Sequence, residues 1–246
     1  MEEIEKLKIE NEKLKEMNAV KSDLISISAH QLRTSLSALK WILKMFLDQD
    51  TGKLTNEQEG LVQKAYNSNE RMIALVNDML TLNHSEDTTI PYNIESIDIL
   101  NLVEQTVFEF SGETSKKGVE LMFLKPENPL PLLRCDEKMI RVVLQNLIEN
   151  AIKYSDQKDK VFISLKQSDK NIEFSVHDTG IGINKEDQDQ IFHKFFRAPN
   201  AVAKDEVGSG LGLFTTQKIV ERHNGKIWFE TKEGNGTTFF VTLPIS

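Results

Sequence analysis

The chain has 246 residues, of which 39% are hydrophobic and 28% charged, as in a soluble globular protein of one large or two ordinary domains. Its formal net charge of −8 argues against a non-specific nucleic-acid binder, which would carry a basic patch or stripe, so no nucleic-acid partner is expected. The single cysteine, Cys135, excludes an intramolecular disulfide and favours a reducing compartment. We interpret Cys135 as a small packing residue.

The N-terminal stretch MEEIEKLKIENEKLKEMN is charged throughout, which argues against a signal peptide. No run of apolar residues approaches the ~20 needed to span a bilayer. We therefore expect a cytoplasmic chain. The sequence leaves open whether a longer natural parent is anchored in a membrane by segments upstream.

Residues 1–21 are predicted to form a coiled coil. Side chains suited to a seam recur at alternating spacings of three and four, at Ile4, Leu7, Asn11 and Leu14. Within this seam, Asn11 suits the role of a register-setting polar residue. The same register continues to Asn18 and Lys21, where the apolar seam ends.

An apolar seam resumes in the next helix, at Ile25, Ala29, Leu32, Leu36, Leu39, Leu43 and Phe46. The step from Ile25 to Ala29 is one residue longer than the first register gives, so a register slip is predicted just before His30. In the stretch SISAHQLRTSLSAL, His30 lies beside the seam and off it. On this pattern alone, His30 is either a histidine on the solvated flank of a helical hairpin or a functional side chain.

A second amphipathic helix is predicted from Asn56 to Leu82, after the polar stretch LDQDTGKLTNEQ. Its seam consists of Leu61, Ala65, Met72, Val76 and Met79. The short connection makes the two helices antiparallel neighbours. Because two helices cannot bury both apolar stripes against each other alone, we expect residues 22–86 to pair with a second copy in a dimeric four-helix bundle.

From Pro91 onward the pattern changes to mixed strands and helices, which predicts an α/β layer domain over residues 91–246. The stretch SEDTTIPYNIES is either a linker or a first edge strand. Helices are expected over residues 99–116, 137–154 and 211–223. Strands are expected over residues 119–124, 161–167, 171–177, 226–231 and 237–243, with the helices on one face.

Two glycine-containing motifs lie in this second domain. In HDTGIGI, Asp178 stands at a strand end ahead of Gly180 and Gly182, so the backbone can approach a flat ligand while the carboxylate accepts a hydrogen bond. GSGLGLF precedes a helix, where exposed N–H groups can cradle phosphate. Each motif alone is also compatible with an ordinary turn, and the two together are stronger evidence for a ligand site.

The segment NLIENAIKYSD places Asn146, Asn150 and Lys153 on one face of a helix. An amide oxygen beside a lysine suits a Mg²⁺ ion that bridges phosphate oxygens, because Mg²⁺ prefers hard oxygen ligands and keeps several waters. A polar helix flank is the alternative for this segment by itself, but it does not account for the two glycine motifs.

Together with IFHKFFR, these motifs resemble, in chain order, the H box, N box, first glycine box, phenylalanine box and second glycine box of two-component sensor histidine kinases. The resemblance covers residues 22–246. It implies a dimerisation and phosphotransfer hairpin over residues 22–86, and a Bergerat-type α/β sandwich over residues 91–246 that belongs to the ATP-binding family of gyrase, Hsp90 and MutL. Residues 1–21 would be a signalling helix that follows a sensor domain absent from this chain.

By this resemblance, His30 is the phosphoacceptor, which fits the chemistry of imidazole as a nucleophile near neutral pH. Thr34 lies one turn further on the same face, at a position that the family ties to dephosphorylation of the partner. The expected activity is ATP-dependent autophosphorylation of His30 and transfer of the phosphoryl group to an aspartate in the receiver domain of a response regulator, with a possible phosphatase activity toward that regulator.

The resemblance also assigns ATP and Mg²⁺ to the second domain. Asn150 would hold Mg²⁺, assisted by Asn146. Asp178 would accept the adenine amino group, while the remaining nucleotide-binding positions are Lys153, Tyr154, Gly180, Gly182 and Ile183. Residues 196–210 would form a mobile lid, with Arg197 as a phosphate contact.

The second glycine box would close around the phosphates through Gly208, Ser209, Gly210, Leu211, Gly212 and Leu213. GNGTTFF resembles the entry to the family's last strand, where Thr237 or Thr238 would support Asp178. The other histidines are interpreted as structural: His84, His177, His193 and His223.

Two positions depart from the family pattern. Gln31 follows the phosphoacceptor where many relatives carry an acid, and an amide cannot take a proton at neutral pH. We hypothesise that Gln31 orients the imidazole and leaves proton removal to solvent, which lowers the autophosphorylation rate. Ser35 stands where the family usually has proline, so less bending of the helix and a changed balance between kinase and phosphatase are expected.

A second class of function remains open at this point. A nucleotide-binding dimeric scaffold, or a related ATPase with little histidine chemistry, would use the same ATP-binding motifs. The complete H box favours the kinase, because related ATPases lack it.

Overall fold

The computed structural model describes residues 2–86, 91–204 and 208–245, apart from the side chains of residues 2, 3, 7, 8, 11, 14, 15, 18, 19 and 86. The chain divides into two compact units: residues 1–91 with 207–211, and residues 92–206 with 212–246. Each unit is described by itself.

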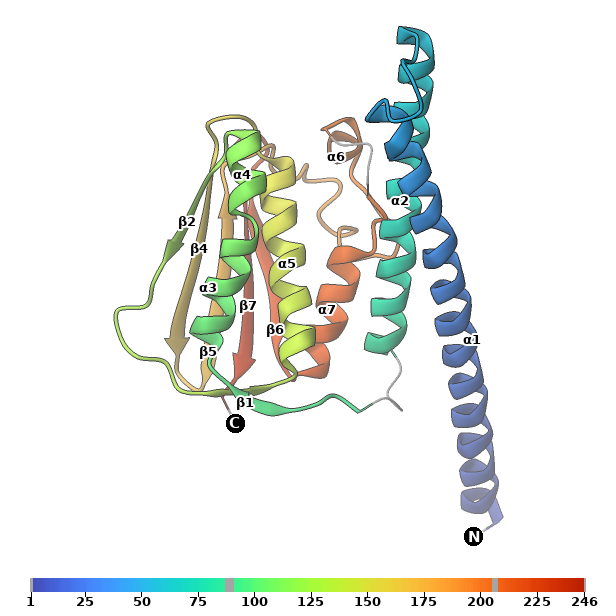
Figure 1. Cartoon of the computed structure of the whole chain (residues 1–246). Helices are drawn as coiled ribbons and strands as arrows, with labels where there is room; N and C mark the ends of the chain where they lie inside the picture. The colour runs from blue at the N-terminus through green and yellow to red at the C-terminus, as the bar shows by residue number, and fades with distance from the viewer. Residues whose placement is uncertain (1, 87–90, 205–207, 246) are drawn as a thin grey trace. The chain divides into compact units, whose positions relative to one another are not determined.

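The first unit is a hairpin of two long helices, α1 (Glu2–Leu47) and α2 (Asn56–Glu86) (Figure 1). A capping box starts α2, because the Gln58 N–H donates to the Thr55 hydroxyl at 3.3 Å and the Thr55 N–H donates to the Gln58 side chain at 2.9 Å. The helix α1 runs without a break through both of the registers expected for it. Four coiled-coil positions, Leu7, Asn11, Leu14 and Asn18, lie outside the described side chains, so that seam stays a prediction.

Polar side chains connect α1 to α2 along the hairpin. The Asn69 amide donates to the Leu36 carbonyl at 2.9 Å, and the Arg33 guanidinium donates to Asn77 at 3.0 Å. Further contacts are Lys40 with Glu70 at 2.9 Å, and Ser22 with Asn83 at 3.3 Å. The two helices therefore meet through polar as well as apolar groups.

Much of the predicted apolar seam stays exposed within one chain. Ala29 and Val76 are buried, as a contact between α1 and α2 requires. Other seam residues are 41% to 62% exposed, namely Leu32, Leu39, Leu61, Met72 and Met79. A single hairpin thus leaves an apolar surface along both helices.

The second unit is built on a five-stranded sheet in the order β2-β4-β5-β7-β6. The strands are β2 (Glu120–Leu124), β4 (Lys160–Ser168), β5 (Asn171–Asp178), β6 (Lys226–Thr231) and β7 (Thr237–Pro244). The strand β2 pairs parallel with β4, and the other neighbours are antiparallel. A separate two-stranded ladder joins β1 (Glu95–Ile97) to β3 (Leu133–Cys135).

Helices cover one face of this sheet (Figure 1). They are α3 (Ile99–Glu109), α4 (Ser111–Lys117), α5 (Glu137–Tyr154) and α7 (Gly212–Arg222), and the short α6 (Pro199–Lys204) precedes α7. Asp98 and Asp136 begin α3 and α5 as N-caps, each accepting the N–H three residues further on.

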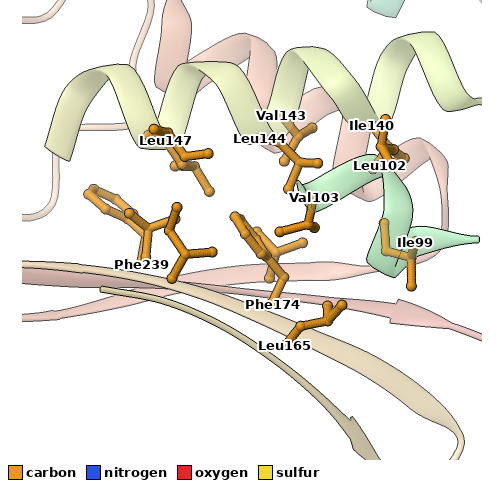
Figure 2. Close-up of a cluster of buried hydrophobic side chains, with 14 of the residues drawn as sticks. Ile99, Leu102, Val103, Ile140, Val143, Leu144, Leu147, Leu165, Phe174 and Phe239 are labelled. Carbon is orange, nitrogen blue, oxygen red and sulfur yellow. The ribbon is translucent and has the colours of Figure 1, made fainter. Parts of the chain in front are cut away.

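The core lies between these helices and the sheet. Side chains of α5, such as Leu144 and Leu147, point toward Phe174 of β5 and Phe239 of β7 (Figure 2). Leu147 is fully buried, and burial of a leucine of this kind stabilises the fold by roughly 1.5–3 kcal/mol. The core therefore holds α5 and β5, whose ends carry several of the predicted ligand-binding residues.

The predicted fold class is confirmed: a long helical region is followed by an α/β domain with helices on one sheet face. One element was wrong in detail, because the helix expected over residues 99–116 is two helices that meet at Phe110. The stretch SEDTTIPYNIES contributes the edge strand β1, and its partner β3 was not expected. None of the described helices is long and apolar enough to cross a bilayer.

Candidate functional site

Asp178 is the buried acid at the end of β5. Its Oδ1 accepts the Gly180 N–H at 3.0 Å and the Thr237 N–H at 3.3 Å. Burial raises the pKa of the Asp178 carboxyl to about 6, against the opposing effect of these two hydrogen bonds. Because both bonds use Oδ1, Oδ2 is the oxygen placed to accept a hydrogen bond from a ligand.

The loop after Asp178 is fixed by close backbone approaches. A Cβ on Gly180 would lie 2.4 Å from the Tyr154 carbonyl oxygen, so no side chain fits there. Gly182 has φ +66°, and a Cβ there would lie 2.3 Å from the Lys232 carbonyl oxygen. The Ile181 N–H donates to the Tyr154 carbonyl at 3.3 Å, and the Ile183 N–H donates to the Thr231 hydroxyl at 3.0 Å. These contacts place the first glycine box between the end of α5 and the end of β6.

Gly236, which sequence reasoning missed, and Thr237 complete the surroundings of Asp178. A Cβ on Gly236 would lie 1.8 Å from the Asp178 carbonyl oxygen, and Gly236 has φ +90°. The support for Asp178 comes from the backbone of Thr237, whereas the Thr238 hydroxyl is 2.8 Å from His177 Nδ1 on the other face of the sheet. Either Thr237 or Thr238 was expected to support Asp178, and Thr237 is the one that does so. The side chain of Thr238 lies on the opposite face, because successive strand residues point to opposite faces. In the sequence, the two glycines of GNG (residues 234–236) could have indicated this close approach of the backbone to Asp178.

Asn146 and Asn150 lie on α5, and the structure gives Asn146 a definite partner. Its amide nitrogen donates to the Gly212 carbonyl at 3.3 Å and to the Thr216 hydroxyl at 3.2 Å. Asn146 therefore ties α5 to the first turn of α7. Asn150 is half-buried one turn further along α5.

The C-terminal end of α5 brings the N box and the phenylalanine box together. Burial raises the pKa of the Tyr154 hydroxyl, while a hydrogen bond with the Arg197 guanidinium acts in the opposite direction. The last carbonyls of α5 accept from Lys117 Nζ, at 2.8 Å for Ile152 and 2.6 Å for Lys153. Sequence reasoning missed Lys117, which holds this helix end as a basic residue at a C-terminus commonly does.

The expected lid contains α6, which contacts the first glycine box. The Asn200 amide donates to the Gly182 carbonyl and to the Asn184 side chain, both at 3.3 Å. Lys204 forms an ion pair with Asp156, just after α5. In the phenylalanine box, Phe192 packs on Phe229 with ring centroids 6.0 Å apart. These contacts join the described part of the lid to the first glycine box and to the segment that follows α5.

The second glycine box is divided between the two units. Residues 208–211 group with the first unit, and residues 212–213 with the second. Within the first group, Gly210 has φ +70°, and the Leu211 N–H donates to the Ser209 hydroxyl at 3.0 Å. Gly212 starts α7, where a Cβ would meet only ordinary contacts with Asn146.

His30 is exposed on α1, directly after the buried Ala29. The Thr34 hydroxyl donates to the His30 carbonyl, and the Ser35 hydroxyl donates to the Gln31 carbonyl, both at 3.1 Å. Helix carbonyls that accept a second hydrogen bond from a hydroxyl one turn later often accompany a bend in a helix. The imidazole of His30 is thus exposed to solvent. In the next turn of the helix, two hydroxyl groups form additional hydrogen bonds with helix carbonyls.

Among the remaining histidines, His223 serves the fold. His223 is buried: its Nε2 accepts the Asp136 N–H at 3.1 Å, and its Nδ1 lies 2.8 Å from the Ile219 carbonyl. Burial lowers the pKa of His223, which keeps its ring neutral. Cys135 is also buried, and burial raises the pKa of its thiol to about 12. Neither side chain is placed for catalysis.

Asn150 offers one amide oxygen as a ligand for a Mg²⁺ ion. Among the described residues, no three His, Cys, Asp or Glu side chains lie together as a metal site. Mg²⁺ commonly takes one or two protein oxygens and completes its shell with phosphate oxygens and water. A single amide oxygen from Asn150 fits an ion that arrives with a nucleotide, and does not fit a permanently held metal.

Two family descriptions match the chain. Residues 20–88 match "His Kinase A (phospho-acceptor) domain", and residues 135–246 match "Histidine kinase-, DNA gyrase B-, and HSP90-like ATPase". The first covers α2 and the part of α1 that carries His30, and the second covers α5, the Asp178 loop and α7.

Named relatives align over most of the chain. The circadian input-output histidine kinase CikA of Synechococcus elongatus is 31% identical over 92% of this chain and 30% of its own length. The adaptive-response sensory kinase SasA of Crocosphaera subtropica is 31% identical over 99% of this chain and 64% of its own. The structure of full-length ShkA in complex with AMPPNP superposes with a TM-score of 0.71 at 27% identity, covering 91% of this chain and 46% of that one. The chain thus spans less than two thirds of the length of these relatives.

Proposed function

The chain belongs to the two-component sensor histidine kinases, and from this premise we propose that it phosphorylates its own His30 with ATP and passes the phosphoryl group to an aspartate in the receiver domain of a response regulator. The observation that carries the proposal is the coexistence of two features in one chain. One is the exposed His30 on a helical hairpin, and the other is the buried Asp178 at a glycine-lined loop.

Asp178 supports the recognition of adenine. Its Oδ2 would accept a hydrogen bond from the exocyclic amino group of the base, while Oδ1 is engaged by two backbone N–H groups. Gly180 and Gly182 keep side chains away from the loop. Guanine carries a carbonyl at the equivalent position, and a carboxylate repels it, so the site would select adenine nucleotides.

The phosphate side of the site would be formed by basic and backbone groups. We assign Lys153 and Tyr154 to the nucleotide because they lie at the end of α5, and Arg197 because it bonds to Tyr154. Ile183, Leu213 and the N–H groups of residues 208–212 would complete this side of the site. Asn150 would hold Mg²⁺, with Asn146 fixing the first turn of α7 beside it. When bound, Mg²⁺ neutralises charge on the phosphate oxygens.

In the transfer step, the unprotonated ring nitrogen of His30 attacks the γ-phosphorus. A nitrogen–phosphorus bond forms as the bond from phosphorus to the β,γ-bridging oxygen breaks, and ADP leaves with that electron pair. The proton on the other ring nitrogen passes to solvent, because Gln31 has no basic oxygen to take it. The neighbouring hydroxyl of Thr34 would take part in a separate reaction, the hydrolysis of the phosphorylated regulator, in which water attacks phosphorus and the aspartate carboxylate leaves.

We further propose the domain organisation and the assembly. Residues 1–21 would be a signalling coiled coil, residues 22–86 the dimerisation and phosphotransfer hairpin, and residues 91–246 the ATP-binding domain. The exposed apolar residues of α1 and α2 support a homodimer, because a second hairpin would cover them. In a longer parent, the coiled coil would connect the hairpin to a sensor domain.

Incubation of the purified chain with γ-labelled ATP and Mg²⁺ tests the proposal. The expected product carries a label that is labile in acid and stable in alkali, and His30→Ala abolishes it. Asp178→Asn lowers the labelling through weaker ATP binding. A chain that binds ATP without acquiring such a label would instead be a nucleotide-binding scaffold.

A further inference from the structure

A groove of about 510 Å³ lies away from Asp178, at the edge of the sheet. It runs between β2 and the helices α3 and α4, which lie beside this strand in Figure 1. Its apolar walls are Val107 and Phe108 of α3, together with Leu121 and Phe123 of β2. Phe108 is 78% exposed, although it is a large apolar side chain. This groove plays no part in the function proposed above.

One wall of the groove is the free edge of a strand. The strand β2 is the last in the sheet order, and within the described ranges it pairs with β4 alone. The backbone N–H and C=O groups on its other edge are therefore available to a further strand. Leu121 and Phe123 face the helices, because their register partners Val161 and Ile163 are core residues. A strand added beside β2 would direct every second side chain into the groove.

The polar groups that line the groove are already paired. Lys125 and Glu104 form an ion pair at 2.6 Å. The hydroxyl groups bond to helix carbonyls, as when Ser111 donates to the Phe108 carbonyl and Ser115 to the Ser111 carbonyl, both at 2.8 Å. The groove thus offers no uncompensated charge, and it is complementary to uncharged apolar side chains. A charged ligand would gain nothing from it.

We propose that this groove binds an extended segment of a partner protein, which pairs with β2 as a sixth strand and inserts apolar side chains at alternate positions beside Phe108. The free strand edge selects an extended backbone, because a helix has no main-chain groups left to pair with it. The neutral apolar walls select the side chains. The bound segment would cover Phe108 and, at the same time, pair with the exposed edge of the sheet.

Hydrogen–deuterium exchange on the full chain tests this proposal with defined probes. The probes are three blocked nonapeptides with lysine at both ends, in which threonine alternates with valine, isoleucine or phenylalanine. At least one of them is expected to slow exchange in residues 119–125 in a saturable manner. If none of the three changes exchange there, the proposal is wrong.

Backbone methylation separates strand pairing from simple apolar contact. Two versions of the bound peptide carry N-methyl groups at the odd or at the even residues, which leaves all side chains in place. Alternate residues of a strand direct their N–H groups to one neighbour, so only one version should lose binding. Equal binding by both versions, or loss of binding by both, would overturn the proposed pairing.

Side-chain variants locate the contact. Phe108→Ser is expected to weaken peptide binding about tenfold, as for an aromatic anchor, and to fold normally because Phe108 is exposed. Leu132→Ser is the matched control, since Leu132 is 58% exposed and does not line the groove. Unchanged affinity in Phe108→Ser would contradict the proposal. Protection of residues 119–125 that rises with protein concentration, without peptide, would show instead that a second copy of the chain occupies the edge.

Labelling with γ-labelled ATP distinguishes a failure of this proposal from a failure of the proposed kinase function. Phe108→Ser should label like the unmodified chain, because the groove is separate from the Asp178 loop. A chain that fails to label but still binds the peptide would contradict only the kinase assignment.

Discussion

At the residue scale, Asp178 is a carboxyl group held in an environment that disfavours its charge. The side chain is buried at the end of β5, and burial raises its pKa from 3.8 to about 6. At neutral pH the group is nonetheless ionised, so the folded chain carries the cost of a buried charge. That cost is understandable if the free carboxylate oxygen serves a ligand, since functional sites commonly retain such groups.

Asp178→Asn should therefore raise stability and reduce nucleotide binding together. At pH 7.5 the raised pKa of Asp178 corresponds to a gain of up to about 3 kcal/mol in the free energy of unfolding when the charge is removed. The asparagine oxygen can still accept from Gly180 and Thr237, but its amide group opposes the amino group of adenine. Chemical denaturation and titration with an ATP analogue measure the two effects.

The pH dependence of the Asp178→Asn stability gain follows from the direction of the shift. A raised acid pKa penalises the folded state fully above about pH 6 and not at all below the ordinary value of 3.8. The stability difference between Asp178→Asn and the unmodified chain should thus shrink as the pH falls from about 6 to about 4. A difference that stays constant over this range would mean that Asp178 has an ordinary pKa.

Gly180→Ala is predicted to damage both the fold and the ligand site. A Cβ at Gly180 would lie 2.4 Å from the Tyr154 carbonyl oxygen, and backbone cannot move aside cheaply. We expect a loss of about 1–3 kcal/mol in the free energy of unfolding and weaker ATP binding. Gly112→Ala is the control, because nothing lies within 4 Å of its Cβ position in α4. That control should stabilise by about 0.5–1 kcal/mol, and similar effects of the two changes would refute the steric argument.

Gln31→Glu is predicted to increase the initial rate of autophosphorylation. A carboxylate next to His30 could accept the ring proton that the amide cannot, and general-base assistance is commonly worth about 10²-fold or more. Gln31 is exposed, so the change should not disturb folding. The side chain in Gln31→Met is of similar size but has neither a carboxylate nor an amide, so this variant should not raise the rate. An unchanged or lower rate in Gln31→Glu would show that proton removal does not limit the reaction.

At the scale of the elements, the sequence predicts those that follow a clear apolar period. The helix α5 and the strand β6 begin and end at the predicted residues, because buried side chains recur at helical spacing in α5, and half-buried side chains alternate with exposed ones in β6. The break between α3 and α4 was not predicted, because α4 (SGETSKK) has no apolar side chains that could mark where a second helix begins after Phe110. The strand β3 is three residues long and exists through its pairing with β1, which no local pattern encodes.

In the candidate site, too, residues that belong to a local motif were predicted, whereas residues whose roles depend on distant contacts were not. The glycines of HDTGIGI were identified because a second glycine motif, GSGLGLF, occurs in the same domain, and the structure gives Gly180 and Gly182 a steric reason. The roles of Lys117, Gly236 and Asn200 depend on contacts between segments far apart in the sequence. Thr237 and Thr238 could not be told apart from the sequence, because their separation rests on the exact register of β7 against β5.

Ser35→Pro tests how the turn after His30 influences the reaction. Proline removes the N–H of residue 35 from the helix ladder and clashes with the carbonyl of Gln31, which now accepts the Ser35 hydroxyl at 3.1 Å. The expected result is a sharper bend and a changed ratio of autophosphorylation to regulator dephosphorylation. Ser35→Ala, which removes only the hydroxyl, separates the loss of that hydrogen bond from the bend. If Ser35→Pro leaves the ratio unaltered, the bend does not set it.

At the scale of the whole molecule, the two units differ in how completely they bury their apolar residues. The sheet unit encloses its core between helices and strands. The helical unit leaves leucine, isoleucine and methionine side chains exposed along both helices, among them Leu32, Leu39, Ile42, Met72, Leu75 and Met79. Large exposed apolar patches are typical of surfaces that a partner covers, so we expect the hairpin to pair with a second copy.

This surface predicts a dimer that a single charge can weaken. The chain has a mass of 28.1 kDa, and light scattering should report twice that value, about 56 kDa. Leu39→Glu places a charge on the exposed apolar surface, where burial against a second hairpin would cost several kcal/mol, so the dimer should dissociate at micromolar concentrations. Leu132→Glu changes a leucine of the sheet unit that is 58% exposed, compared with 41% for Leu39, and should leave the mass at the dimer value. An unmodified chain that remains at 28.1 kDa at high concentration would refute the four-helix bundle, and the exposed leucines of α1 and α2 would then need a different partner.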